Sequence, residues 1–372
     1  MDSDHIAAAL TLLALPRAGA SAVNRMLDAT GDPCQALRLP APMLTTLGLH
    51  PDTVSAHAAC RGLPSTQALR QRDWLLGSDV QVLPRNCEEY PGLLLQIARP
   101  PPFLFLKGSA AAIRLPQVAV VGSRKPTPAG REFAADLAVG LVRYGLAVTS
   151  GLARGIDTAA HGGALFGGGI TVAVMGTGPD RVYPASNREL AACVLASGGA
   201  LLTEYPPGVP PEAAHFPQRN RLISGLGLGV VVVEAALPSG SLSTATHAAE
   251  QGREVMSVPG PVRSPTSRGC HELLRNGAAL IETPEDVIRA LGDRFKPRAV
   301  VSPGPVSAPS ADPRELGEQA QQVFAATSTL PAGIDLLVSR CGLPVAEVSA
   351  AVVLLELAGL LESTPAGVAR LR

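Results

Sequence analysis

Short, continuously apolar runs alternate with segments of helical periodicity between about residues 70 and 292. These runs occupy 117–122, 146–151, 170–176, 200–204, 229–234 and 254–259. Runs without polar alternation are typical of strands in a sheet that helices cover on both faces. The first intervening helix is expected to start at Thr127 and Pro128 and to stop at Gly145. The pattern therefore predicts an α/β fold with a right-handed, doubly wound parallel sheet.

The pattern changes on both sides of this region. Residues 1–68 carry Ala/Leu-rich helical periodicity, which predicts a small helical domain, and 69–292 form the sheet domain. Residues 293–315 are rich in Pro, Ser and Ala and are interpreted as a linker. Residues 316–372 hold three helical patterns and a terminal stretch suited to a hairpin wing. Because no Lys or Arg occurs between Gly342 and Thr364, we do not expect the third of these helices to read a major groove.

Composition limits where a polyanion could bind. The chain has 372 residues, 46% apolar residues and a formal net charge of zero, so a cationic site must be a local patch. Lysine occurs only at positions 107, 125 and 296, and arginine carries nearly all the positive charge. Arginine is the better bidentate phosphate ligand of the two.

The sequence contains few features that indicate a cellular compartment or a bound cofactor. The six cysteines are scattered without a C-x-x-C pair, which favours reduced thiols over structural zinc or a disulfide framework. The first apolar run follows an acidic start where a signal peptide would be basic, and no apolar stretch reaches about 18 residues. We therefore expect a cytoplasmic protein with no membrane partner, no metal and no cofactor.

Candidate ligand-binding residues follow the predicted strands, where doubly wound sheets bind their ligands. They are Gly122, Ser123 and Arg124 after the first strand, Arg154 after the second, Arg181 after the third, and Ser239, Gly240, Ser241 and Thr244 after the fifth. Glycine and serine before a helix suit an anion, because the first helical amides lack partners. Neither G-x-G-x-x-G nor G-x-x-x-x-G-K-[ST] occurs at these loops. Each loop taken alone could be ordinary turn chemistry.

One segment, HFPQRNRLISG at 215–225, concentrates positive charge before the fifth strand. It contributes Arg219, Asn220 and Arg221. Together with the four loops it predicts a phosphate-binding cradle. If the segment is helical from Pro217, the two arginines lie about 200° apart, so at most one points into the cradle. Leu222, Ile223 and Leu226 would anchor the segment to the core.

The same loops lack a recognisable catalytic set. No Ser/His/Asp or His/Asp/Glu group has diagnostic spacing, so we predict no catalytic residue. Asp157 suits a helix start and is expected to cap the helical amides there rather than act as an acid or base, while His161 is interpreted as an ordinary helical histidine. Glu234 could be a base, although fixing nearby amides or arginines is the simpler role.

Several ordered blocks together resemble the DNA-processing protein A (DprA/Smf) family. They are VVGSR (120–124), SGLARGIDTAAH (150–161), GTGPDRVYPASN (176–187), EYPPG (204–208), HFPQRNRLISGL (215–226), VVEAALPSGSLSTA (232–245) and GREVMSVPG (252–260). The resemblance implies an extended Rossmann-type domain between a sterile-alpha-motif-like (SAM-like) helical domain and a winged-helix-like domain. It further implies a homodimer, formed through the Rossmann-type domain, that binds single-stranded DNA without cleaving it. Such a protein would protect incoming DNA and help load RecA onto it during natural transformation.

The resemblance assigns the DNA pocket to Ser123, Arg124, Arg154, Arg219, Asn220, Arg221, Ser239, Gly240 and Ser241. The chain departs from the family in two places. Glu212, Ala213 and Ala214 stand where many relatives carry a basic residue, and Cys270 and His271 replace small hydroxyl and amide residues. Affinity could be lower, or Arg154 or Arg181 could supply the missing charge.

Two other functions use the same type of fold. Phosphoribohydrolases carry a P-G-G-x-G-T-x-x-E block, but the corresponding loop here reads PSGSLSTATH, and Glu250 comes too late to match its acid. This enzyme class would therefore lack its general acid–base group. A nucleotide sensor that holds a mononucleotide in the cradle is the remaining alternative.

Overall fold

The structure is a computed structural model that describes residues 1–297, 317–328, 332–357, 360–364 and 367–370. The chain divides into two compact units, Met1–Val300 and Val301–Arg372. The predicted linker lies outside the described residues from 298 onward. No helix of the described ranges combines the length and the apolar character needed to cross a membrane.

The first unit contains a nine-stranded sheet in the order β1-β2-β6-β5-β4-β3-β7-β8-β9. Its strands are β1 (Val80–Pro84), β2 (Phe103–Gly108), β3 (Gln117–Gly122), β4 (Ala147–Ser150), β5 (Thr171–Val174), β6 (Ala200–Thr203), β7 (Gly229–Val233), β8 (Glu254–Ser257) and β9 (Ala279–Leu280). Strands β3 to β9 are parallel, whereas β2 is antiparallel to both β1 and β6. The sheet is therefore mostly parallel and doubly wound, as predicted.

The six predicted strands correspond to β3 through β8, with ends that differ by at most two residues. Strands β1, β2 and β9 were not predicted, and β2 joins the otherwise parallel sheet antiparallel to both of its neighbours. The direction of β2 depends on pairing with a distant partner, because Phe105 lies opposite Thr203. A pattern read along the chain carries no information on such a pairing.

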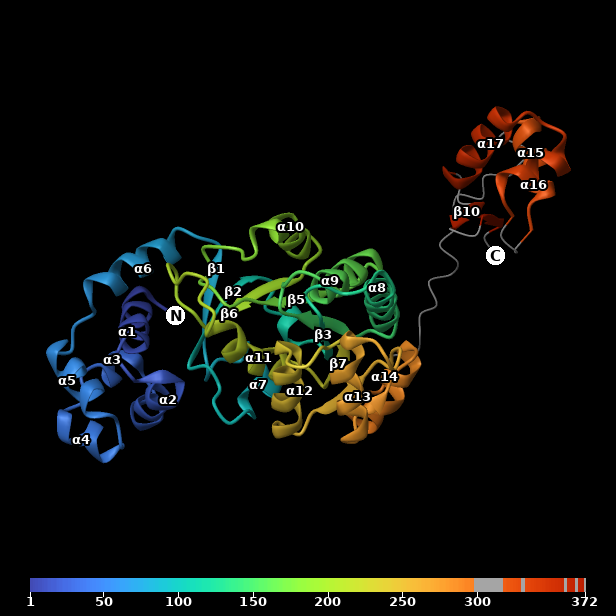
Figure 1. Ribbon diagram of the computed structural model, residues 1–372. Coiled ribbons are helices and arrows are strands. Elements are labelled where there is room, and N and C mark those ends of the chain that lie inside the picture. Colours follow the sequence, from blue (N-terminus) through green and yellow to red (C-terminus); the bar gives the residue numbers. More distant parts are fainter. Residues whose placement is uncertain (298–316, 329–331, 358–359, 365–366, 371–372) are drawn as a thin grey trace. The chain divides into compact units, whose positions relative to one another are not determined.

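Helices cover both faces of the sheet (Figure 1). One face carries α8 (Pro128–Arg143), α9 (Ile156–Phe166), α10 (Arg188–Ala196) and α14 (Pro284–Leu291), and the other carries α7 (Gly92–Leu95), α11 (His215–Leu226), α12 (Gly240–Glu250) and α13 (Arg268–Arg275). Short 3-10 turns occur at η1 (Ala112–Arg114), η2 (Ala185–Asn187), η3 (Pro265–Ser267) and η4 (Gly292–Arg294). The Thr127 side chain caps α8 by accepting a hydrogen bond from the Gly130 amide, as its position predicted.

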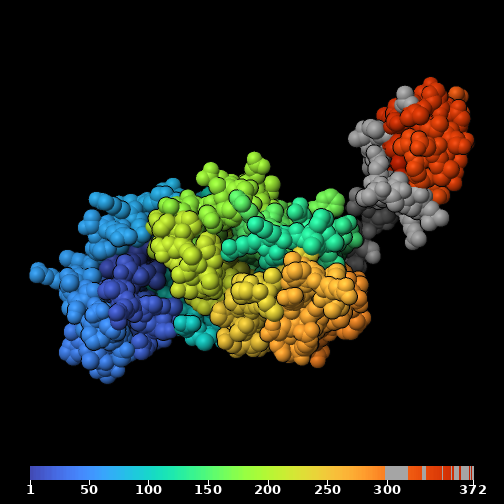
Figure 2. Space-filling model, in the orientation of Figure 1, coloured from blue at the N-terminus to red at the C-terminus, as the bar shows by residue number. Residues whose placement is uncertain are grey.

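The N-terminal helices pack against the edge of the sheet rather than standing apart (Figure 2). They are α1 (Ser3–Leu13), α2 (Gly19–Thr30), α3 (Pro33–Ala36), α4 (Ala41–Thr46), α5 (Pro51–Ala59) and α6 (Thr66–Leu76). Strand β2 directs Phe103 and Phe105 into the helical cores, whereas Leu104 and Leu106 enter the main core of the sheet. This alternation is the two-residue period of a strand between two layers. The predicted boundary at residue 68 falls inside α6.

The second unit contains α15 (Glu318–Ala326), α16 (Ile334–Cys341) and α17 (Val345–Leu357). A two-stranded hairpin, β10 (Leu361–Thr364) with β11 (Gly367–Arg370), follows them. Val323, Leu337, Val348 and Leu355 are buried in a core of their own. Three helices and a wing give the winged-helix arrangement that the sequence predicted.

Substitution of two adjacent glycines of α9, Gly162 and Gly163, provides a test of how closely α9 packs against α8. A Cβ on Gly163 would lie 2.2 Å from the Ala135 carbonyl oxygen, whereas a Cβ on Gly162 would meet nothing within 4 Å. We expect Gly163→Ala to lower the free energy of unfolding by about 1–3 kcal/mol through overpacking. The control Gly162→Ala should raise it by about 0.5–1 kcal/mol, because alanine is the better helix former.

Fluorescence of Trp74, the chain's single tryptophan, follows unfolding of the first unit in urea. Equal effects of the two substitutions would contradict this close approach of the helices.

Candidate functional site

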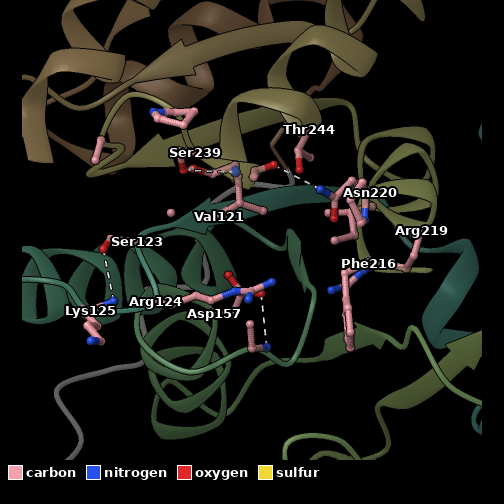
Figure 3. A pocket seen from close by; sticks show the side chains of 18 residues that line it. Val121, Ser123, Arg124, Lys125, Asp157, Phe216, Arg219, Asn220, Ser239 and Thr244 are labelled. Atoms are coloured by element: carbon pink, nitrogen blue, oxygen red, sulfur yellow. Dashed lines mark hydrogen bonds between the residues drawn. The ribbon is translucent and has the colours of Figure 1, made fainter. Parts of the chain in front are cut away.

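A cavity of about 460 Å³ opens at the carboxyl ends of the central strands (Figure 3). From β3 the chain winds through β4, β5 and β6 on one side, and then crosses to β7 on the other side of β3. The loops after β3 and β7 consequently leave the sheet in different directions. Such a switch point is where doubly wound sheets bind ligands.

Most of the predicted site residues meet at this cavity. Its lining includes Gly122, Ser123, Arg124, Arg219, Asn220, Ser239, Gly240, Ser241 and Thr244. They come from four separate segments: the β3 loop, α11, the β7 loop and the first two turns of α12. The loops after β3 and β7 therefore converge with the HFPQRNR segment as predicted, whereas the loop after β5 does not reach the cavity.

Three predicted residues do not line the cavity. Arg154 is exposed on the β4–α9 turn. Arg181 pairs with its neighbour Asp180, with 2.9 Å between Nη2 and Oδ2. Arg221 forms an ion pair with Glu204, and both side chains are largely buried. The expectation that Arg154 or Arg181 supplies the charge of the cradle finds no support in this geometry.

Arg219 lies beneath the cavity and is only 3% exposed. Its Nη1 donates to the Gly151 carbonyl oxygen at 2.7 Å and to the Val174 carbonyl oxygen. A Cβ on Gly151 would lie 2.3 Å from this nitrogen, so only glycine leaves room for the guanidinium. Burial lowers the pKa of Arg219 to about 10, so the side chain remains a cation at neutral pH.

Asp157 is a buried carboxyl that lines the same cavity as Arg219. Its Oδ2 accepts hydrogen bonds from the amides of Gly151 (3.0 Å) and Ala153 (3.2 Å), which precede α9. The N-cap of α9 is Gly155, without a side-chain hydrogen bond, so the prediction that Asp157 caps this helix was wrong. Burial raises the pKa of the Asp157 carboxyl, while the Arg219 charge and these amides act in the opposite direction. Asp157 and Arg219 bind the amide and the carbonyl oxygen of the same residue, Gly151, and so organise the β4–α9 turn.

The N-terminus of α12 forms another wall. The Ser239 Oγ accepts a hydrogen bond from the Ser241 amide at 3.3 Å and lies 2.7 Å from the Ser241 hydroxyl. Asn220 Nδ2 donates to the Gly240 carbonyl oxygen (3.1 Å) and to Ser243 Oγ (2.8 Å), which fixes α11 to this turn. A helix N-terminus carries partial positive charge and offers amides to an anion.

The exposed charge of the cavity comes from the loop after β3. Gly122 permits this loop to leave the sheet, because a Cβ there would lie 1.8 Å from the Val233 carbonyl oxygen. Ser123 Oγ then accepts a hydrogen bond from the Lys125 amide at 3.1 Å. Arg124 and Lys125 are exposed, and neither has an ion-pair partner within the described ranges. Lys125 was not predicted as a site residue, although the rarity of lysine in the sequence was a usable signal.

Phe216 adds an aromatic surface to the same cavity. The guanidinium carbons of Arg124 and Arg219 lie 5.9 and 6.0 Å from the centre of its ring. The ring centre of Tyr183 lies 5.5 Å away, and this tyrosine is half exposed. Phe216 was also missed as a site residue, although the aromatic–proline pair was visible in the sequence.

The other titratable groups near the strand ends already have partners. Glu234, at a φ of 55°, accepts hydrogen bonds from the Thr127 amide (2.9 Å) and the Thr127 hydroxyl (2.5 Å), and so fixes the start of α8. His161 is buried, with its Nδ1 2.7 Å from the Thr171 hydroxyl, and burial lowers its pKa to about 3. Among the described residues, a cluster suited to a metal occurs elsewhere, at His5, Asp32 and Cys34.

The positions that depart from the family lie away from this cavity. Cys270 is 1% exposed, and its Sγ contacts the Val232 carbonyl oxygen. His271 Nε2 lies 3.0 Å from the Gly260 carbonyl oxygen. The exposed residues 212–214 precede α11 and are not part of the cavity wall.

Comparisons with known proteins agree with this architecture. A family described as DNA recombination-mediator protein A matches residues 81–292, more than half of the chain. The chain belongs to this family. Every residue that lines the cavity lies within the matched range. The family's winged helix domain, described as DprA winged helix domain, matches residues 307–367.

Individual relatives cover most of the chain. It is 41% identical over 301 residues to Protein Smf of Escherichia coli K12, covering 80% of this chain and 79% of that protein. The crystal structure of DNA processing protein A from Streptococcus pneumoniae has a TM-score of 0.67 at 33% identity, covering 78% and 98%. A structure of the Helicobacter pylori protein, solved to study its single-stranded DNA binding mode, has a TM-score of 0.52 at 29% identity, covering 58% and 97%.

The buried Arg219 side chain yields a stability prediction. Arg219→Met would leave the carbonyl oxygens of Gly151 and Val174 without the hydrogen bonds they accept, so we expect the free energy of unfolding to fall by about 1–3 kcal/mol. Arg124→Ala is the control, because an exposed arginine without an ion pair should change stability by less than about 0.5 kcal/mol. Urea denaturation followed by Trp74 fluorescence measures both. A stability of Arg219→Met equal to that of the control would exclude this structural role for Arg219.

Proposed function

We propose that this member of the family binds single-stranded DNA, without sequence preference, in the cavity between β3 and β7. The main support for this proposal is that one cavity is lined by two exposed cations without ion-pair partners, Arg124 and Lys125, by the N-terminus of α12 and by the aromatic ring of Phe216. Cations and amides hold phosphates of any sequence. The relative from Helicobacter pylori, studied for its single-stranded DNA binding mode, supports the assignment.

The aromatic ring favours a single strand over a duplex as the ligand. Phe216 lies at the cavity wall beside Arg124, so a base could stack on its ring while the adjacent phosphate meets the guanidinium. Bases in a duplex are already stacked on one another and are not free to do this. Stacking is sequence-tolerant because every base has a π-face.

We further propose that the chain protects incoming DNA during natural transformation, helps load RecA onto it, and acts as a homodimer in the cytoplasm. The family membership supports these statements, and they stay predictions. Light scattering of the purified chain would measure the dimer. Retention of RecA on the immobilised protein, with and without an oligonucleotide, would measure the contact with RecA. A monomer in light scattering would contradict the proposed homodimer, and a lack of RecA retention would contradict the proposed role in RecA loading.

We also propose that the protein does not cleave the strand it binds. Two carboxylates at the strand ends support this, since Asp157 accepts hydrogen bonds from two backbone amides and Glu234 accepts them from both donors of Thr127. We expect single- and double-stranded oligonucleotides to remain intact with Mg²⁺ on a denaturing gel. Cleavage that stays with the protein through repurification would contradict the proposal.

A mononucleotide sensor is the second candidate, favoured by the volume of the cavity. About 460 Å³ lies within the usual range of about 300–1,000 Å³ for small-ligand sites. Competition separates the two functions: a free nucleotide should displace a labelled oligonucleotide only if the site is specific for mononucleotides.

The decisive variant removes the free cations. Arg124→Ala with Lys125→Ala should weaken binding of all single strands alike and reduce the slope of log K against log salt by about 1.4, or about 0.7 per lost phosphate contact. Arg114→Ala with Arg143→Ala is the matched control, because these exposed arginines lie near the opposite edge of the sheet, before β3 and β4. Fluorescence anisotropy at several salt concentrations measures both. Equal slopes in the two double variants would refute the assigned site.

Phe216→Ala provides a second arm of this experiment. It should weaken binding by about 1–3 kcal/mol through lost stacking while leaving the salt slope unchanged. Phe166→Ala is its control, because Phe166 is 88% exposed at the far end of α9.

A further inference from the structure

Three potential metal ligands meet in the N-terminal helical region. His5 belongs to α1, Asp32 is the cap residue of α3, and Cys34 lies within α3. Their ligand atoms all lie within 4.8 Å of one another, and each side chain is partly buried. The cluster lies outside residues 81–292, so it is separate from the DNA cavity.

A hydrogen bond between His5 and Asp2 fixes the orientation of the His5 ring. Its Nδ1 lies 2.6 Å from Asp2 Oδ1, and its Nε2 contacts Asp32 Oδ2. Histidines that ligate metals commonly donate their second ring nitrogen to a carboxylate in this way, which fixes the tautomer and the direction of the free nitrogen. Asp2 therefore orients His5, and Nε2 faces the other ligands.

We propose that His5, Asp32 and Cys34 bind a divalent transition-metal ion of the zinc type, with water as the fourth ligand. A mixed imidazole, carboxylate and thiolate set suits zinc, whereas magnesium and calcium require oxygen ligands. Binding replaces the hydrogen bond between His5 Nε2 and Asp32 Oδ2 with a bond from each atom to the metal, and it releases to solvent both the proton of that hydrogen bond and the Cys34 thiol proton.

Access and charge are consistent with this site. His5 and Asp32 line an open cavity of about 410 Å³, through which an ion can approach from solvent. The neighbouring carboxylate of Asp28 pairs with Arg85 across the same cavity and is not available as a ligand. A bound ion would join the start of α1 to the turn between α2 and α3, and so stabilise the helical region.

Cobalt(II) titration of the full chain tests the proposal, because a thiolate ligand gives a charge-transfer band in the near ultraviolet. We expect the band to saturate at one equivalent and to disappear when zinc is added. Cys34→Ser should abolish the band. Asp2→Asn should lower the affinity for the metal ion by about 10–100-fold, and His5→Ala should lower it at least as strongly. Cys60→Ser is the control, since Cys60 is a partly buried thiol of the same region that donates to the Ala56 carbonyl oxygen.

A second measurement needs no variant. Zinc should slow alkylation of Cys34, measured by mass spectrometry, and leave alkylation of Cys60 unchanged. Equal alkylation rates with and without zinc, or a cobalt band that persists in Cys34→Ser, would overturn the proposal. His5 would then serve as a protonated bridge between Asp2 and Asp32. Oligonucleotide binding should not change in any of these variants, which keeps the metal site distinguishable from the DNA cavity.

Discussion

The burial of one guanidinium organises the candidate site. Arg219 is almost without solvent contact, and a buried cation is tolerated only where hydrogen bonds and an opposite charge replace water. The Arg219 Nη1 donates to the carbonyl oxygens of Gly151 and Val174, and the charge of the nearby Asp157 carboxyl favours the cation. Because Gly151 directly follows β4 and Val174 ends β5, the guanidinium fixes α11 against the sheet at the position where the cavity forms.

The arginines of this site have two different roles, structural support and ligand contact. Arg219 and Arg221 have structural roles: Arg219 binds the ends of β4 and β5, and Arg221 pairs with Glu204. The held position of α11 directs Phe216 and Asn220 to the cavity wall, where Asn220 braces the start of α12. The cations left to meet a ligand are Arg124 and Lys125, on a short loop after β3. Buried charge gives the site rigid support and exposed charge is left to contact the ligand, which suits the proposed binding of a flexible single strand.

Local chemistry made much of the fold predictable. Strands β3 to β8 are continuously apolar because helices cover both of their faces, and Thr127 caps α8 as its position suggested. Strands β1 and β2 escaped prediction because they lie at the edge, in a proline-rich stretch, and their pairing joins distant segments. The His5, Asp32 and Cys34 cluster was invisible for the same reason, since its spacing matches no metal motif and only the packing of α1 against α3 brings it together.

The sequence by itself placed the loops after β3 and β7 at one edge of the sheet, because the carboxyl ends of parallel strands must meet there. It also determined that Arg219 and Arg221 face different directions, since two residues along a helix turn the side chain by about 200°. Only the tertiary structure decided what each arginine meets, because partners such as Gly151, Val174 and Glu204 come from other strands and loops. Whether a charged side chain is buried or free to bind depends on those distant partners, and no local pattern encodes them.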